Sequence, residues 1–215
     1  MSTADFLLSS EVQKILKLAF AEPAGVFSAA ELAKRTKLSL EDVQRTREHL
    51  VKSGILIERS ATSENQEGVG ANTSFVFYNE LRAIALKSFA AAEPIRAMLR
   101  TKFKDSVVQA FVLGEDEDST IELLVVHGQQ VPDQAAMTAA CTKLSAAIGR
   151  HLKVHVISSA KYSALDKRDA LGAKLHAGAG FEIIAAGETK ARPAQDQGGL
   201  IEGARKRLTA LVRGL

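Results

Sequence analysis

The sequence predicts an α+β fold made of a helical N-terminal section that closes with two strands, and a later section in which strands and helices alternate. Three observations support this. Apolar residues recur at helical spacing through the first 50 residues, two short apolar runs follow, and from about residue 93 strand-like runs alternate with helical segments. The expected divisions are residues 1–92, residues 93–187, and a polar linker with an amphipathic helix at 188–215.

Length and composition indicate a folded protein. The 215 residues suffice for two domains of roughly 100 residues each, and 46% apolar with 25% charged residues is ordinary for a globular chain. The net charge of +3, with a pI near 9.0, is compatible with nucleic-acid binding without requiring it. A single cysteine, Cys141, excludes an internal disulfide, and no apolar run is long enough for a membrane span. Because the N-terminus also lacks a secretory pattern, we expect a cytoplasmic protein without a membrane segment.

Three helices are predicted in the first section. Residues 6–20 form a helix that stops before Pro23. The second helix begins at Ser28, with Glu31 three residues later as in a capping box. The third begins at Ser39 and ends at Gly54. Its expected inward residues are Leu40, Val43, Leu50 and Val51.

A β-hairpin is expected after these helices. Residues 55–57 read as its first strand, residues 61–72 as a polar flexible loop, and residues 74–78 (SFVFY) as the returning strand. Three short helices followed by a hairpin are typical of a winged helix-turn-helix, in which the third helix enters the major groove of DNA.

Duplex DNA is therefore the expected partner. Gln44 suits an adenine edge, Arg45 suits guanine or phosphate, and hydroxyls at helix starts suit phosphate. The candidate contact residues are Lys34, Arg35, Thr36, Lys37, Ser39, Gln44, Arg45, His49 and Arg59. The alternative is a solvated helix of mixed charge, because acidic residues dilute the positive potential of the third helix. One such module makes few contacts, so a homodimer on a two-part site is expected.

The second section reads as a small α/β domain. The expected strands are residues 107–113, 121–126 and 154–157, with an edge strand at 181–187. The expected helices are residues 79–92, a second one from Pro94 to residue 103, then 132–152 and 162–177.

Residues 111–125 carry a family resemblance. The run FVLG, a hairpin and then STIELLV resembles the nucleotidyltransferase-like domain of the DNA polymerase beta superfamily, which some prokaryotic regulators fuse to a winged helix-turn-helix. The resemblance covers about residues 10–187. It implies that two Asp at alternate strand positions, and a carboxylate on a later strand, hold divalent metal against nucleotide phosphates. Here Gly114 is kept and Glu115 replaces a Ser, while Thr120, Glu122 and His155 occupy the three carboxylate positions.

This departure predicts a domain that is catalytically inactive, without metal or cofactor, and used for dimerisation or sensing. Nucleotide binding is compatible with the scaffold but is not predicted. The consecutive acidic residues 115–118 cannot all converge on one ion, since neighbours in an extended chain face opposite sides. They read as a solvated turn, and the alternative is a weak cation site held by the loop.

Other motifs carry weaker signals. His151 and His155 have a helical ligand spacing, but we expect the chain to change from helix to strand between them, so that they diverge. Gly178 and Gly180 read as a helix stop. The C-terminal helix, within residues 200–215, is expected to dock on its own domain or a second subunit, or to contact DNA.

Three functions remain open at this point. The first is a DNA-binding transcriptional regulator with an inactive second domain. The second is a Mg²⁺-dependent nucleotidyltransferase that uses Glu122 and the acidic turn. The third is a protein-interaction adaptor whose winged helix does not bind DNA.

Overall fold

The structure, a computed structural model, describes residues 2–60, 67–116, 118–177 and 180–193. It forms two compact units, and the α+β class is confirmed. The first unit comprises Met1–Ala97, Asp116–Thr120 and Cys141–Leu152; the second comprises Met98–Glu115, Ile121–Ala140 and Lys153–Leu215. The amphipathic C-terminal helix and Gly178 fall outside the described residues, so the predictions made for them stay predictions.

Three helices open the first unit: α1 (Ser10–Ala21), α2 (Ala29–Thr36) and α3 (Leu40–Lys52). A serine immediately precedes each helix, and its hydroxyl accepts a hydrogen bond from the backbone N–H three residues later. This bond satisfies one of the free N–H donors at the start of the helix. The three capping residues are Ser9, Ser28 and Ser39. The predicted starts of the second and third helices are thus confirmed.

A single apolar core holds these helices together. Helix α3 contacts α1, α2 and the first strand through its buried side chains. The ring of Phe20, on α1, is fully buried and meets Tyr78 edge to face at 5.6 Å between ring centroids. Fully or almost fully buried members of the core include Ile15, Leu16, Leu32, Val43, Leu50 and Leu56. Leu40 was expected inside, but it is exposed because it is the first residue of α3, outside the contact of that helix with its neighbours.

The hairpin pairs β1 (Leu56–Ser60) with β2 (Glu67–Ala71) in antiparallel register. The prediction of a strand at residues 74–78 is wrong: residues 74–77 form a turn, the helix that follows begins at Tyr78, and Val76 and Phe77 are 75% and 58% exposed. The preceding residues 67–71, expected in a loop, form the strand instead.

The position of β2 is explained by the close approach of its backbone to the backbone of residues 25–27. Val69 exchanges two backbone hydrogen bonds of 2.9 Å with Phe27, far away in the sequence. A Cβ atom on Gly70 would lie 2.6 Å from the backbone oxygen of Gly25, so a residue without a side chain is required there. The glycines that make residues 67–71 look like a loop are therefore what allows this strand to pack.

Two helices follow the hairpin: α4 (Tyr78–Lys87) and α5 (Ala92–Lys102). The first was expected to run to residue 92, but it ends at Lys87. Ser88 N and Ala90 N both donate to Ala85 O, which closes the helix with a turn, and α5 begins two residues before Pro94.

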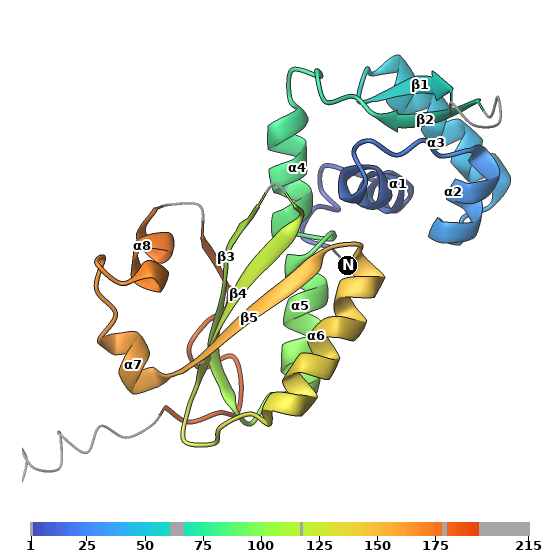
Figure 1. The fold of residues 1–215 in the computed structure, drawn as a ribbon. Coiled ribbons are helices and arrows are strands. Elements are labelled where there is room, and N and C mark those ends of the chain that lie inside the picture. Colours follow the sequence, from blue (N-terminus) through green and yellow to red (C-terminus); the bar gives the residue numbers. More distant parts are fainter. Residues whose placement is uncertain (1, 61–66, 117, 178–179, 194–215) are drawn as a thin grey trace, which may run out of the picture. The chain divides into compact units, whose positions relative to one another are not determined.

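The second sheet has four strands in the order β5-β4-β3-β6 (Figure 1). These are β3 (Val107–Glu115), β4 (Thr120–His127), β5 (His151–Ser158) and β6 (Phe181–Ile184), with α6 (Gln134–Ile148) between β4 and β5. Strand β3 is antiparallel to both of its neighbours, and the sheet as a whole is mixed. The four strands predicted at residues 107–113, 121–126, 154–157 and 181–187 are all present, with different ends.

Helix boundaries in this section differ from the prediction. Helix α6 was expected to continue to residue 152, but it ends at Ile148, since Gly149 adopts a left-handed conformation (φ 67°) and β5 starts two residues later. The helix expected at 162–177 is two short helices, α7 (Ser159–Ser163) and α8 (Ala170–His176).

Both faces of the sheet are covered. Side chains of α7, α8 and the segment between them pack on one face, as Figure 1 shows for the two helices. That face presents Phe111, Leu113, Leu124, Val126 and Ile157. Residues that alternate with these along the strands, among them Ala110, Val112, Leu123 and Val125, are also fully buried. Helices of the described ranges are all too short or too polar to cross a membrane.

Candidate nucleic-acid interface and the Glu122 cluster

Helix α3 has one side packed against the core and an opposite, polar side that is exposed to solvent. Val43, Thr46 and Leu50 are buried against the core, which fixes the rotation of the helix about its axis. The outer side therefore turns toward solvent, and its exposed residues are Gln44, Arg45, Glu48 and His49. Amide, guanidinium and imidazole groups at this spacing can reach base edges from a helix lying in the major groove.

Arg45 is a highly accessible cation on this outer side. Its side chain is 71% exposed, and its Nη2 lies 2.7 Å from Asp42 Oδ1. Asp42 in turn accepts a 2.7 Å hydrogen bond from the Ser39 hydroxyl, so Ser39 and Asp42 act as a cap of the helix. Exposed ion pairs stabilise by about 0–1 kcal/mol, so a phosphate or a guanine can replace Asp42 as the partner of Arg45.

Two lysines flank the turn between α2 and α3. Lys34 and Lys37 are exposed, and Lys37, the residue that follows α2, adopts the left-handed conformation (φ 58°). Three residues then separate the two helices, which is the short turn that a helix-turn-helix needs.

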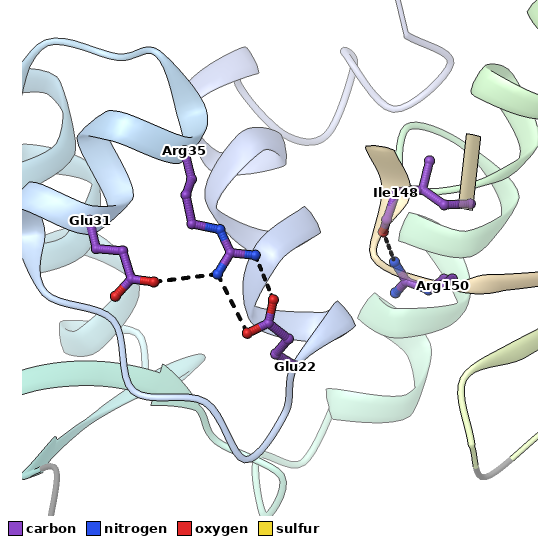
Figure 2. Close-up of polar contacts among 5 residues, drawn as sticks. All are labelled: Glu22, Glu31, Arg35, Ile148 and Arg150. Carbon is purple, nitrogen blue, oxygen red and sulfur yellow. Dashed lines mark hydrogen bonds and ion pairs between the residues drawn. The ribbon is translucent and has the colours of Figure 1, made fainter. Parts of the chain in front are cut away.

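Arg35 is committed to the protein itself. Its Nη2 lies 2.5 Å from Glu22 Oε1, its Nη1 lies 3.4 Å from Glu31 Oε1, and Figure 2 shows the guanidinium between these two carboxylates. The guanidinium carbon also lies 5.2 Å from the ring centroid of Phe27. The hydrogen bond that Arg35 donates to Glu22 is the main cause that raises the pKa of Arg35. Arg35 therefore ties α2 to the end of α1.

Thr36 and Arg59 are likewise turned inward. Thr36 is buried, and its hydroxyl donates to Leu32 O at 2.6 Å. The guanidinium of Arg59 donates to two backbone oxygens, Pro23 O at 3.2 Å and Ala71 O at 2.9 Å. The nine candidate residues thus reduce to an outer set, which we call the α3 surface: Lys34, Lys37, Gln44, Arg45 and His49, with Ser39 as its cap.

Sequence reasoning missed a groove beside the α3 surface. It has a volume of about 500 Å³ between α3 and β1, and Gln44, Glu48 and Lys52 line its α3 side. Arg47 also lines it, and its Nη2 lies 3.6 Å from Glu58 Oε1 on β1. The partial burial of the Arg47 side chain agrees with a stem that packs on the protein.

In the second unit, Glu122 lies at the centre of a cationic cluster. Its side chain is 16% exposed; Oε1 accepts from Lys153 Nζ at 3.1 Å, and Oε2 accepts from Lys174 Nζ. Nε2 of His155 lies 3.9 Å from Oε1 and has no hydrogen-bond partner among the described residues. The hydrogen bond from Lys174, followed by that from Lys153, lowers the pKa of Glu122. We call these four residues the Glu122 cluster.

Lysine ammonium groups thus occupy both carboxylate oxygens of Glu122. Three of the other sequence-predicted positions lie on the same two strands. Gly114 is the cross-strand partner of Glu122, Glu115 ends β3, and Thr120 begins β4, two residues before Glu122. Among the described residues, His, Cys, Asp and Glu side chains do not gather in any group of three or more that could hold a metal ion.

The acidic turn has a local structural role. Oδ1 of Asp116 accepts backbone hydrogen bonds from Asp118 at 3.0 Å and Thr120 at 2.8 Å. Ser119 adopts a left-handed conformation (φ 58°) that completes the reversal. The side chain of Asp116 therefore organises the β3–β4 turn.

The expected divergence of His151 and His155 is wrong. Both residues lie on β5, so they point to the same side of the strand, because residues four apart in a strand share a face. Helix α6 ends before His151, which removes the helix-to-strand change that the prediction assumed.

The first unit thus combines three helices with a β-hairpin, and the second contains a mixed sheet in which the strand carboxylate of Glu122 is ion-paired. Comparison of the chain with protein-family models, with curated proteins and with solved structures returned no match.

Acid should weaken the Glu122 cluster. The folded-state pKa of Glu122 lies below its ordinary value of 4.5, so its ion pairs stabilise the protein above that pH and this contribution is lost as the pH falls through the folded-state pKa. We expect the free energy of unfolding, measured by chemical denaturation at a series of pH values below 4.5, to fall less steeply in Glu122→Gln than in the wild type.

Glu80→Gln is the matched control, since it removes an exposed carboxylate at the start of α4. It should keep the wild-type pH dependence. Equal slopes in all three proteins would show that the lysines do not stabilise ionised Glu122.

Proposed function

We propose that this protein is a DNA-binding transcriptional regulator. The observation that carries the proposal is the packing of α3: one side is buried against α1, α2 and β1, while the α3 surface faces solvent beside a short turn and a β-hairpin. This is the arrangement in which a helix-turn-helix delivers its second helix to the major groove.

Different residues of the α3 surface would contact different parts of the DNA. Gln44 and Arg45, in the first half of α3, would contact base edges. Lys34 and Lys37, on the other side of the turn, would contact phosphates and set the register on the duplex. One module of this size makes few contacts, so we propose a homodimer on a two-part site.

The second unit would be a degenerate nucleotidyltransferase-like domain used for dimerisation or sensing. Metal-dependent phosphoryl transfer needs carboxylates with free oxygens that converge on the ions. Glu122 instead gives both oxygens to Lys153 and Lys174. This ion pairing supports a regulator over the alternative, a Mg²⁺-dependent nucleotidyltransferase.

A titration with labelled duplex DNA tests the proposal. Fluorescence anisotropy of a random-sequence duplex should show binding that weakens with salt, with a log–log slope of about −0.9 for each phosphate neutralised. A selection of bound sequences from a random pool then identifies the preferred site. Absence of binding at about 50 mM salt would exclude the regulator, because nonspecific phosphate contacts are strongest at low salt.

A specific observation favours a protein-interaction adaptor as second candidate. The apolar side chains of Phe6 and Leu7 are exposed, and a groove of about 410 Å³ lies between this N-terminal segment and α3. Val12, Leu50 and Ile55 give the groove an apolar floor, which suits a protein segment better than DNA. The DNA titration separates the two candidates, since an adaptor would give no salt-dependent DNA binding.

A further inference from the structure

A pocket in the second unit lies on the sheet face that α7 and α8 cover. It has a volume of about 490 Å³, within the range of small-molecule sites. The residues that shape it are Phe111, Tyr162, Leu165, Leu175, His176 and Glu182. The pocket is thus bounded by β3, β6, both short helices and the segment between them.

The inner part of the pocket is aromatic and aliphatic. Phe111, on β3, stacks against Tyr162, on α7, with ring centroids 5.4 Å apart and planes inclined by 19°. Leu165 and Leu175 pack on the same cluster. These side chains form a wall that would hold the apolar part of a ligand.

The polar rim is dominated by one negative charge. Glu182 is the direct cross-strand partner of Phe111, so the carboxylate and the ring share one face of the sheet. One carboxylate oxygen, Oε1, accepts a 3.0 Å hydrogen bond from the amide of Gln109. Within the described part of the chain Glu182 has no cationic partner, and the described lining of the pocket contains neither lysine nor arginine.

Other polar groups of the rim are already engaged or neutral. The hydroxyl of Ser163 donates to Ser159 O at 3.0 Å, and Nδ1 of His176 lies 2.7 Å from Gly172 O. The hydroxyl of Tyr162 has no hydrogen-bond partner among the described residues. Burial, and then the charge of Glu182, raise the pKa of Tyr162, so this phenol stays protonated and can donate.

We infer that this pocket binds a small organic cation, an amine or quaternary ammonium attached to an apolar group. Glu182 is its counterion, and the partly exposed ring of Tyr162, one face of which stacks on Phe111, attracts the positive charge as well as the apolar body. An anion would be repelled by this exposed carboxylate, and a neutral ligand would gain nothing from its charge. The inference goes beyond the proposed function and is independent of whether α3 binds DNA.

Three soluble probes of nearly the same shape test the charge preference: phenethylammonium, 2-phenylethanol and phenylacetate. Isothermal titration of the full chain should show phenethylammonium binding at least about tenfold more tightly than 2-phenylethanol, with phenylacetate weakest. Nuclear Overhauser contacts between the probe and the ring of Tyr162 should place it in the pocket.

Glu182→Gln keeps the size of the side chain and removes its charge. It should lower the preference for phenethylammonium over 2-phenylethanol severalfold and leave only the part due to the aromatic ring, while Glu80→Gln keeps the wild-type preference. Equal binding of the three probes, no binding of phenethylammonium up to about 10 mM, or contacts that do not involve Tyr162 would each overturn the inference. Because the probe contacts are measured on the wild type, the inference is testable even if the variant does not fold.

Discussion

Replacement of Arg45 by Glu is expected to weaken duplex binding by about 1–3 kcal/mol, on the order of five- to hundredfold in affinity. The Arg45 side chain is 71% exposed, and it forms its ion pair with the exposed carboxylate of Asp42, on the same helix. The substitution does not touch the core, so the protein should fold normally by circular dichroism. Fluorescence anisotropy with the selected duplex measures the loss, and the salt slope should become shallower by about one unit.

Two further variants distinguish a direct contact of Arg45 with DNA from an effect of net charge on DNA affinity. Lys102→Glu makes the same change of charge type at the end of α5, outside the first unit, and should leave affinity almost unchanged. Asp42→Asn removes the carboxylate that competes for Arg45 and should not weaken binding. If Lys102→Glu lowers affinity as much as Arg45→Glu does, net charge alone explains the effect and the proposed contact is wrong.

Truncation of Phe20 to Ala should cost about 3–5 kcal/mol of unfolding free energy. The ring is fully buried in the core of the first unit and packs edge to face on Tyr78. Since domains are stable by only about 5–15 kcal/mol, we expect a large drop in the midpoint of chemical denaturation, and loss of DNA binding near that midpoint.

Phe77→Ala provides the control of the same chemistry. Phe77 is exposed in the turn before α4, so its truncation should change stability by about 0.5 kcal/mol or less. A strand at residues 74–78 would make this truncation costly. Equal costs for the two phenylalanines would therefore contradict both the burial of Phe20 and the position of β2.

The features that could be predicted from the sequence are those fixed by contacts between residues close together in the chain, such as helix starts and buried strands. Serine caps at Ser28 and Ser39 mark helix starts because a hydroxyl in that position accepts a backbone hydrogen bond within three residues. The buried strands β3 and β4 were predicted because their apolar runs are long and rich in β-branched residues. The strand position of Glu122 followed from the second of these runs.

Contacts between distant residues could not be predicted. Strand β2 depends on Phe27, which pairs with Val69, and nothing in the run EGVGA indicates that partner. Lys174 reaches Glu122 across 52 residues of sequence, and Arg59 bonds Pro23 across 36. The same limitation explains why Arg35 looked available for DNA, because its main partner, Glu22, lies 13 residues earlier at the end of α1.

Lys153 also affects how the edge of the sheet can pair with other chains, because it lies on the edge strand β5. Among the described strands β5 is outermost on its side of the sheet, so its outer backbone edge offers hydrogen bonds to any extended chain that approaches. An incoming strand would have to desolvate the charged amine of Lys153 next to the imidazoles of His151 and His155. Lys153, which pairs with Glu122, thereby also discourages edge-to-edge aggregation along β5.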